Sequence, residues 1–391
     1  MKQRRVRLGE VVQLSPKPEM GGLKSHESVA FLAMADVGDD GSVLNVQRRS
    51  IADVVKGYTA FRNGDVLLAK ISPCFENGKA ALVKGLFSDM GFGSTEFHVL
   101  RPNEEIDARY LFHLVWNPIF RSKGQQRMTG SAGQKRLPAA FVRDFEVDLP
   151  SITEQKRIAT ILDKAQSIWR KREQAFLLSN EFLRSSFLEI FGDPAKNPKG
   201  WPVVTIRDLV SSVSYGTSKK ANEGKGKYPV LRMNNLTYSG EIDMASLKYV
   251  DLDPLEEPKY LARRGDVLFN RTNSKDLVGK TAVYESDEPM AIAGYLVRVR
   301  TNDDANPHYL SGFLNSVYGK QLLKSMCKSI IGMANINAQE LQSIRIMIPP
   351  RSVQDRYAEI VGRTRKLKQR LTSSLGELES INASLSFRFF G

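Results

Sequence analysis

The chain has 391 residues, 41% of them hydrophobic, which is enough for two domains with cores of their own. No apolar run approaches about 18 residues and no apolar segment follows the basic N-terminus, so neither a membrane span nor a secretion signal is predicted. The two cysteines, Cys74 and Cys327, form no CxxC pattern, and four histidines are few, which argues against a structural zinc site or a disulfide framework. These features predict a cytoplasmic protein.

The formal net charge of +14 favours a polyanionic partner, of which nucleic acid is the usual one. Most of this charge, +8, lies outside the two long helical stretches described below, so it is not merely the solvated face of a helix. A basic protein that binds no polyanion is the alternative.

In chain order, the first predicted domain (residues 1–149) combines short strands with helices. A strand-like run and a turn at Gly41 lead to the block FRNGDVLLAKISPCFENGKAAL at 61–82. The tripeptide Asn63-Gly64-Asp65 in this block is typical of a tight turn that begins a buried strand. A polar loop follows that strand. The domain then continues with a strand, a helix and a glycine-containing loop, at 96–101, around Tyr110 and at 130–138.

A long helix is predicted for residues 150–192. Ser151 and Glu154 have the spacing of a capping box after Pro150, and no further proline or glycine occurs before Gly192. Apolar residues recur at intervals that are sums of three and four, which is typical of a coiled-coil seam. They are Ile158, Leu162, Ala165, Trp169, Phe176, Leu183 and Ile190. About 38 helical residues span roughly 57 Å.

The rest of the chain repeats this order at an offset of about 200 residues. A linker with two prolines (193–201) leads into a second domain (202–349), whose block ARRGDVLFNRTNSKDLVGKTAV matches the first in Gly265-Asp266. The polar loops of the two blocks differ in almost every residue, as a recognition surface requires. A second long helix follows at 350–391. Its apolar stripe is Ile360, Leu367, Leu371, Leu378, Ile381 and Leu385.

We therefore predict an α/β (α+β) protein with two tandem globular domains. The two long helices are expected to form an antiparallel coiled coil, which gives the chain an approximate two-fold internal repeat. The alternative is that each helix packs on its own domain as a plain amphipathic helix.

These features resemble the specificity (S) subunit of Type I restriction-modification enzymes. The resemblance covers the whole chain and is most specific in LPSITEQKRIATILDKA, FLEIFGDPAKNPKGWP, RRGDVLFNRT and YPVLRMNNLTYSGEI. The first domain matches less well, through its repeat relation to the second. The resemblance implies that each globular domain is a target-recognition domain that reads one half of a split DNA sequence. It also implies that the helices set the gap and that the chain itself is not an enzyme.

The expected partners are double-stranded DNA, two methyltransferase (M) subunits and, as an optional addition, two restriction (R) subunits. The resemblance places S-adenosylmethionine, Mg and ATP on those partner subunits and no cofactor or metal on this chain. In agreement, the sequence has no GxxxxGK[ST] motif and no Asn-Pro-Pro-aromatic motif. The alternative function is a duplicated protein- or RNA-binding scaffold with a coiled-coil arm.

Arg and Lys read guanine, Asn and Gln read adenine, and basic or hydroxyl groups meet phosphates. Polar residues near the repeat loops are therefore candidate DNA contacts, although each could be an ordinary solvated side chain. In the first domain they are Lys70, Lys79, Gln134, Lys135 and Arg136. In the second they are Ser218, Lys219, Lys220, Arg232, Asn234, Asn235, Asn270, Arg271, Asn273, Lys275 and Lys280.

Lys79 and Lys280 share one position in both repeats, which makes them the stronger candidates for phosphate contacts. Aromatic residues near the helix ends are candidates for binding a methyltransferase subunit. The alternative is that they seal the ends of the coil against the domains. They are Trp169, Phe187, Phe191, Phe389 and Phe390.

Overall fold

A computed structural model of the chain describes residues 4–18, 27–131, 133–274, 277–330 and 333–391. It divides into two compact units. Unit 1 comprises Met1–Arg172 with Ser374–Gly391, and unit 2 comprises Glu173–Ser373. Helices α6 (Ile152–Phe191) and α11 (Arg351–Phe390) each contribute residues to both units. None of the helices in the described ranges is long and apolar enough to cross a membrane.

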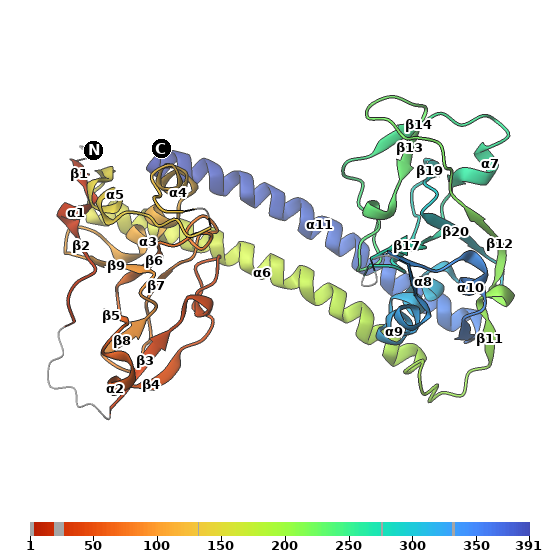
Figure 1. The fold of residues 1–391 in the computed structure, drawn as a ribbon, viewed down its shortest axis with the longest axis horizontal. Helices are drawn as coiled ribbons and strands as arrows, with labels where there is room; N and C mark the ends of the chain where they lie inside the picture. Colours follow the sequence, from red (N-terminus) through yellow and green to blue (C-terminus); the bar gives the residue numbers. More distant parts are fainter. Residues whose placement is uncertain (1–3, 19–26, 132, 275–276, 331–332) are drawn as a thin grey trace. The chain divides into compact units, whose positions relative to one another are not determined.

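Unit 1 contains short strands and helices before α6 (Figure 1). They are β1 (Arg4–Arg7), α1 (Leu8–Val11), β2 (Val12–Leu14), β3 (Ser28–Leu32), η1 (Met34–Asp36), β4 (Gln47–Ser50), α2 (Ile51–Val54), β5 (Thr59–Arg62), β6 (Val66–Ala69), β7 (Ala80–Leu82), β8 (Met90–Gly93), β9 (Phe97–Pro102), α3 (Ala108–Trp116), α4 (Pro118–Gln125), α5 (Ala139–Asp144) and β10 (Glu146–Leu149).

Unit 2 repeats that series and adds short strands of its own. Its elements are β11 (Val203–Thr205), η2 (Ile206–Leu209), β12 (Val210–Tyr215), β13 (Tyr228–Leu231), η3 (Met233–Asn235), β14 (Lys248–Val250), α7 (Glu257–Tyr260), β15 (Leu261–Ala262), β16 (Val267–Asn270), β17 (Thr272–Asn273), β18 (Thr281–Val283), β19 (Met290–Ile292), β20 (Leu296–Thr301), α8 (Pro307–Asn315), α9 (Val317–Met326), β21 (Lys328–Ile330), β22 (Met333–Asn335), α10 (Ala338–Gln342) and β23 (Arg345–Met347).

The two units share one sheet topology, which confirms the predicted α+β class and the internal repeat. The antiparallel order β2-β9-β6-β7 of unit 1 corresponds to β12-β20-β16-β18 of unit 2. The mixed order β4-β3-β8-β5 corresponds to β14-β13-β19-β15, and in both the pair β3/β8 or β13/β19 is parallel. Each unit also has a two-stranded sheet, β1-β10 or β11-β23, and a further sheet in unit 2 has the order β17-β22-β21.

Strand β6 shows how each core is organised. Val66 and Leu68 point into a cluster with helix α3, whereas Leu67 and Ala69 point into a second cluster with the mixed sheet. Side chains alternate between the faces of a strand, so a strand buried on both faces reads as an unbroken apolar run. Strand β16 follows the same rule, which explains why VLLA and VLFN are apolar throughout.

The glycine-aspartate turn before these strands is structural. Gly64 and Gly265 both have φ of +91°, a conformation that favours glycine. The buried Asp266 carboxylate accepts the Arg263 amide at 2.9 Å and the Arg300 Nε at 2.8 Å. Asp65 pairs in the same way with Arg101. The turn therefore ties the start of β6 or β16 to the neighbouring strand.

The long helices run antiparallel within each unit. In unit 1, Arg172 Nη1 donates to the Ser374 carbonyl at 3.1 Å, and Leu385 packs on the cluster that contains Ile158. In unit 2, Lys368 Nζ donates to Asn180 Oδ1 at 2.7 Å. The end of α6 also meets the start of α11 there, because the rings of Phe187 and Tyr357 are 5.5 Å apart.

Two residues of the predicted stripe on α11 were assigned wrongly. Leu367 and Ile381 are each 50% exposed. The buried stripe in unit 2 instead follows Tyr357, Val361, Thr364 and Lys368. A tyrosine, a threonine and a lysine interrupt the apolar pattern on that face, so the apolar spacing pointed to the neighbouring face.

Candidate nucleic-acid interface

In unit 2, three polar segments meet at the turn Ala293–Tyr295 between β19 and β20. The Thr217 amide donates to the Ile292 carbonyl at 2.8 Å, and the Ala293 amide donates to the Leu231 carbonyl at 2.9 Å. The Arg271 amide donates to the Tyr295 carbonyl at 3.0 Å. These backbone bonds bring three of the predicted segments together: Ser218 to Lys220, the chain after Leu231, and the loop after β16.

Arg271 and Asn273 form the best-defined part of this surface. Asn273 lies on β17, which pairs with β22, so the loop after β16 and the glycine-containing loop are joined in one small sheet. The Arg271 guanidinium lies 4.8 Å from the centre of the Tyr215 ring, and its Nε is 3.4 Å from Asn335 Oδ1. Guanidinium groups stack on aromatic faces in this way, and their hydrogen-bond donors lie along the edge of the plane.

Other predicted residues of unit 2 are used within the fold. Asn235 is buried, and its amide donates to the carbonyls of Asp243 and Ala245 at 2.9 and 3.1 Å. Asn270 is fully buried at the end of β16. The ammonium of Lys219 lies 3.1 Å from Asp253 and 2.5 Å from Glu256.

The remaining predicted residues of unit 2 differ in exposure. Ser218, Lys220 and Asn234 are exposed. Arg232 is partly buried and donates to the Ser246 carbonyl at 2.6 Å. Lys275 lies outside the described residues.

Unit 1 gathers a matching but smaller group. The Lys70 amide donates to the Glu96 carbonyl at 2.9 Å, as Arg271 does to Tyr295 in unit 2. Gln134, Lys135 and Arg136 are exposed beside it, because the Leu137 amide donates to the Lys70 carbonyl. The Glu96 carboxylate pairs with Arg136 at 2.8 Å, and the hydrogen bond from this guanidinium lowers the pKa of Glu96.

Lys79 and Lys280 hold equivalent places but differ in surroundings. Lys79 Nζ donates to the Val37 carbonyl at 2.8 Å and lies 3.9 Å from the Asp39 carboxylate, so it turns away from the Lys70 group. Within the described part of the chain, Lys280 has no carboxylate partner, and burial lowers its pKa.

Sequence reasoning missed two aromatic residues of the unit 2 surface. Tyr295 is 53% exposed at the tip of the β19–β20 turn, and Tyr215 is 39% exposed beneath Arg271. Tyrosine is a frequent contact residue on such surfaces because its ring stacks and its hydroxyl donates hydrogen bonds. In the sequence, the signal for an exposed tyrosine at this turn was the dipeptide Gly294-Tyr295, because glycine is typical of turns.

The predicted aromatic residues of the helix ends lie in or beside the cores. Phe187 and Phe191 are buried in the core of unit 2, and the ring centres of Phe191 and Tyr309 are 4.7 Å apart. Phe389 and Phe390 pack on the core of unit 1, and Trp169 is partly buried. Exposed large apolar side chains on α6 are instead Ile152, Ile168, Leu177, Leu178, Phe182 and Leu188.

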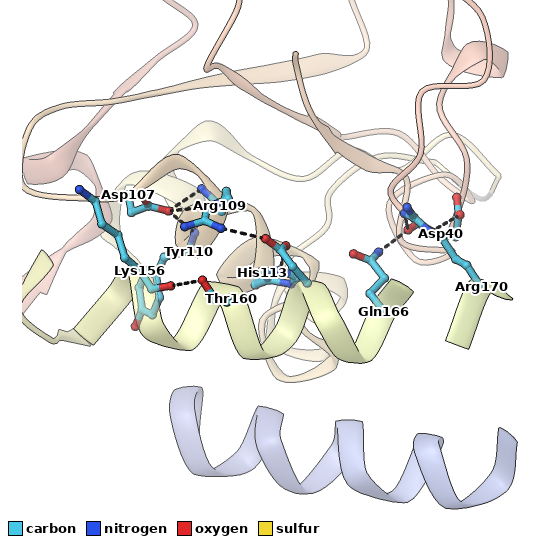
Figure 2. A network of polar contacts seen from close by, with 10 residues as sticks. Asp40, Asp107, Arg109, Tyr110, His113, Lys156, Thr160, Gln166 and Arg170 are labelled. Carbon is cyan, nitrogen blue, oxygen red and sulfur yellow. Dashed lines mark hydrogen bonds and ion pairs between the residues drawn. The ribbon is translucent and has the colours of Figure 1, made fainter. Parts of the chain in front are cut away.

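Polar contacts hold each long helix against its domain, as Figure 2 shows for unit 1. Arg170 and Gln166 both donate to the Asp40 carbonyl, at 2.6 and 2.5 Å. One turn closer to the helix start, Asp163 accepts from His113 at 2.8 Å and from Arg109 at 3.2 Å. Burial opposes ionisation of Asp163, but these two partners lower its pKa.

Unit 2 has a corresponding contact with the charges reversed. Glu285, in the loop after β18, pairs with Arg365 of α11 and lies 3.3 Å from His308 of α8. Burial alone would raise the pKa of Glu285, but the hydrogen bond from His308 and the charge of Arg365 lower it to about 2.

Comparison with known proteins identifies the family. Residues 4–175 and 198–379 each match the family described as Type I restriction modification DNA specificity domain. The chain belongs to this DNA specificity family. The two matched ranges agree with the duplicated fold, and the predicted family, DNA-recognition role and non-catalytic character are confirmed.

Relatives and solved structures agree with this assignment. Over 97% of its length, the chain is 25% identical to the Type I restriction enzyme EcoEI specificity subunit of Escherichia coli, of which it covers 80%. It is 38% identical to the EcoAI specificity subunit of Escherichia coli over 44% of the chain and 29% of that protein. The S subunit of a Type I restriction-modification system from M. genitalium shares the fold, with a TM-score of 0.62, 12% identity and coverage of 99% of this chain and 96% of that one.

Membership of the DNA specificity family has consequences for partners and cofactors. The family carries no cofactor of its own. Its members act with DNA and with the methyltransferase and restriction subunits of type I systems.

Proposed function

We propose that each globular domain reads one half of a split duplex target and that the two long helices set the gap between the halves. The observation that carries this proposal is the pair of unlike polar loops on one shared sheet topology. Arg271 and Asn273 in unit 2 follow β16, and Lys70 in unit 1 follows the equivalent strand β6. Gln134 lies in the loop that pairs with the segment after Lys70 through the bridge between Ile71 and Arg136. The same frame thus presents two different sets of base-reading groups.

Exposure supports dividing the candidate residues by role. We assign base reading to side chains with free planar edges and phosphate contacts to exposed basic or hydroxyl groups. The base-reading candidates are Gln134, Asn234, Arg271 and Asn273. The Arg136 guanidinium is instead held by the Glu96 carboxylate. The phosphate candidates are the exposed Lys135, Ser218 and Lys220 and the partly buried Lys70.

The partners follow from the same proposal. Two methyltransferase subunits hold S-adenosylmethionine, and two restriction subunits, where present, use ATP and Mg; the complex works in the cytoplasm. The exposed side chains Leu177, Leu178 and Phe182 support a partner surface on α6, because apolar groups rarely gather on a helix face without a partner.

The test is methylation mapping by long-read sequencing. This chain is expressed together with its genomically adjacent methyltransferase, and the host DNA is read for methylated adenine. A split, asymmetric motif with a fixed gap is expected. Methylation that lacks a split motif, or that occurs without this chain, would contradict the proposal.

A further inference from the structure

A basic cleft lies in unit 2 beside helix α9. It has a volume of about 500 Å³, and Arg184, Tyr238, Lys320 and Gln321 contribute to its lining. Cavities of roughly 300–1,000 Å³ are typical of sites for small ligands. None of the groups that we assign to base reading lines this cleft.

Arg184 and Lys320 line this cleft, and Lys280 lies close to Lys320. Lys320 Nζ donates to the Gly279 carbonyl at 2.8 Å and lies 5.0 Å from the centre of the Tyr238 ring. Burial, together with the nearby charges of Lys280 and Arg184, lowers the pKa of Lys320 to about 8. Among the described residues, no carboxylate forms an ion pair with Arg184, Lys280 or Lys320. The cluster therefore has an unbalanced positive charge.

In the first repeat, an acidic residue balances the positive charge at the equivalent position. At an offset of 199 residues, Arg121 of α4 takes the place of Lys320, and its Nη1 donates to the Glu76 carbonyl at 3.1 Å. Asp39 stands where the second repeat has Tyr238. Its carboxylate lies 3.9 Å from Lys79 Nζ. Burial lowers the pKa of Arg121, and the charge of Asp39 opposes this effect only in part.

The two long helices also differ in charge at this place. Arg184 of α6 contributes a cation to the cleft in unit 2. The residue at the equivalent place on α11 is Ala383. Two differences between the repeats, tyrosine in place of an acid and arginine in place of an alanine, thus leave these cations of the second repeat without a counter-charge from the residues that the structure describes.

We propose that this cleft binds a phosphate group, and that the first repeat has no such site because Asp39 fills the role of the anion there. Arg184 supplies a planar guanidinium and Lys320 an ammonium, the two groups that proteins use most for phosphate. The volume admits the phosphate with an attached sugar. The inference rests on the proposed function in one respect: if the chain reads DNA, the phosphate belongs to the DNA backbone.

The test copies the first repeat into the second. Tyr238→Asp places an acid beside Lys320, and Tyr238 is 47% exposed, so the fold tolerates the change. Lys320→Gln removes the partly buried cation. Leu255→Asp is the matched control, because it adds the same charge to unit 2 at a side chain that is 94% exposed and does not line the cleft.

Two probes are titrated against the full chain: inorganic pyrophosphate by calorimetry, and a mixed-sequence DNA duplex at several salt concentrations. Pyrophosphate binding is expected to weaken at least tenfold in Tyr238→Asp and Lys320→Gln but not in Leu255→Asp. If the phosphate comes from DNA, the slope of log affinity against log salt also falls by about one. If only pyrophosphate binding falls, the site takes a free phosphate compound.

Equal binding of both probes by the parent chain, Tyr238→Asp and Lys320→Gln would overturn the inference. That result is distinguishable from failure of the proposed function. If methylation mapping finds a split motif but the variants bind both probes as the parent chain does, only the phosphate site in the cleft is rejected. A missing motif together with pyrophosphate binding that depends on Tyr238 rejects the DNA-reading role and leaves the phosphate site standing.

Discussion

Gln155 and Gln354 occupy equivalent places near the starts of α6 and α11, and both are fully buried. Gln354 Nε2 donates to the carbonyls of Asp304 and Pro349 at 2.9 and 2.8 Å, and its Oε1 accepts the Asn306 amide at 2.8 Å. Gln155 makes the same three bonds in unit 1. One amide side chain therefore satisfies three backbone groups where each long helix joins its domain.

Gln354→Leu is expected to destabilise unit 2 by about 2–4 kcal/mol, because it leaves three backbone groups buried without partners. Hydrogen exchange detected by mass spectrometry should show faster exchange in α8 and the start of α11. Gln369→Leu, at an exposed site on the same helix, should change stability by less than about 0.5 kcal/mol. Equal effects of the two substitutions would contradict the structural role of Gln354.

Glu285 gives unit 2 a defined response to acid. Its pKa falls from the ordinary 4.5 to about 2 on folding, so the ionised form is favoured in the folded state. The contribution to stability is present above pH 4.5 and is lost as the pH falls toward 2. The Glu285 side chain is 40% exposed, so solvent screening limits this contribution to about 1 kcal/mol.

Glu285→Gln should therefore lower the free energy of unfolding by about 1 kcal/mol at pH 7. The difference from the parent chain should shrink between pH 4.5 and 2, where the carboxylate of the parent protonates. Urea unfolding at a series of pH values measures it. A difference that stays constant over this range would show that the charge of Glu285 is not the cause.

At the scale of elements, the sequence pattern correctly identified the turns, strands and helices that depend on local backbone geometry. The turns at Gly64 and Gly265, the strands that follow them and the two long helices all lie where the sequence predicted. The pairing of Asp266 with Arg300 was not foreseen, because it joins residues 34 positions apart on neighbouring strands. The exposure of Leu367 was missed for a related reason: which helix face is buried depends on the partner.

Asp266 offers a test at this scale. Asp266→Asn should destabilise unit 2 by about 3 kcal/mol, because it leaves Arg300 and the buried Arg298 without their carboxylate. Asp287→Asn breaks an ion pair with Arg264 in which both partners are largely exposed, and it should cost less than about 1 kcal/mol. Thermal unfolding compares the two. Similar costs would mean that the turn carboxylate does not hold β16 to β20.

For the whole molecule, the duplicated topology predicts modular specificity. Replacing residues 203–349 with the corresponding domain of another specificity subunit should change one half of the methylated motif and leave the other half and the gap unchanged. Methylation mapping of the hybrid provides the measurement. The donor domain should keep an asparagine at the place of Asn306, because its side-chain Nδ2 donates to Asp355 of the retained helix α11 at 2.7 Å.

A hybrid in which both half-sites change would contradict independent reading by the two domains. A hybrid that folds but directs no methylation requires a control. Exchanging residues 203–349 for the same segment of a relative with an identical loop after β16 should keep the original motif.

The sequence by itself determined the repeat, the family, the positions of the two long helices and the basic character of the domains, because these depend on local pattern, spacing and composition. Only the tertiary structure decided which of the candidate polar residues reach the surface. Asn235 and Asn270 look as suitable for base reading as Asn234 and Asn273, yet the fold buries the first two. Lys79 and Lys280 align in sequence, but one faces Asp39 and the other lies beside a second lysine. The partners of a side chain come from segments distant in the chain, and only packing brings those segments together.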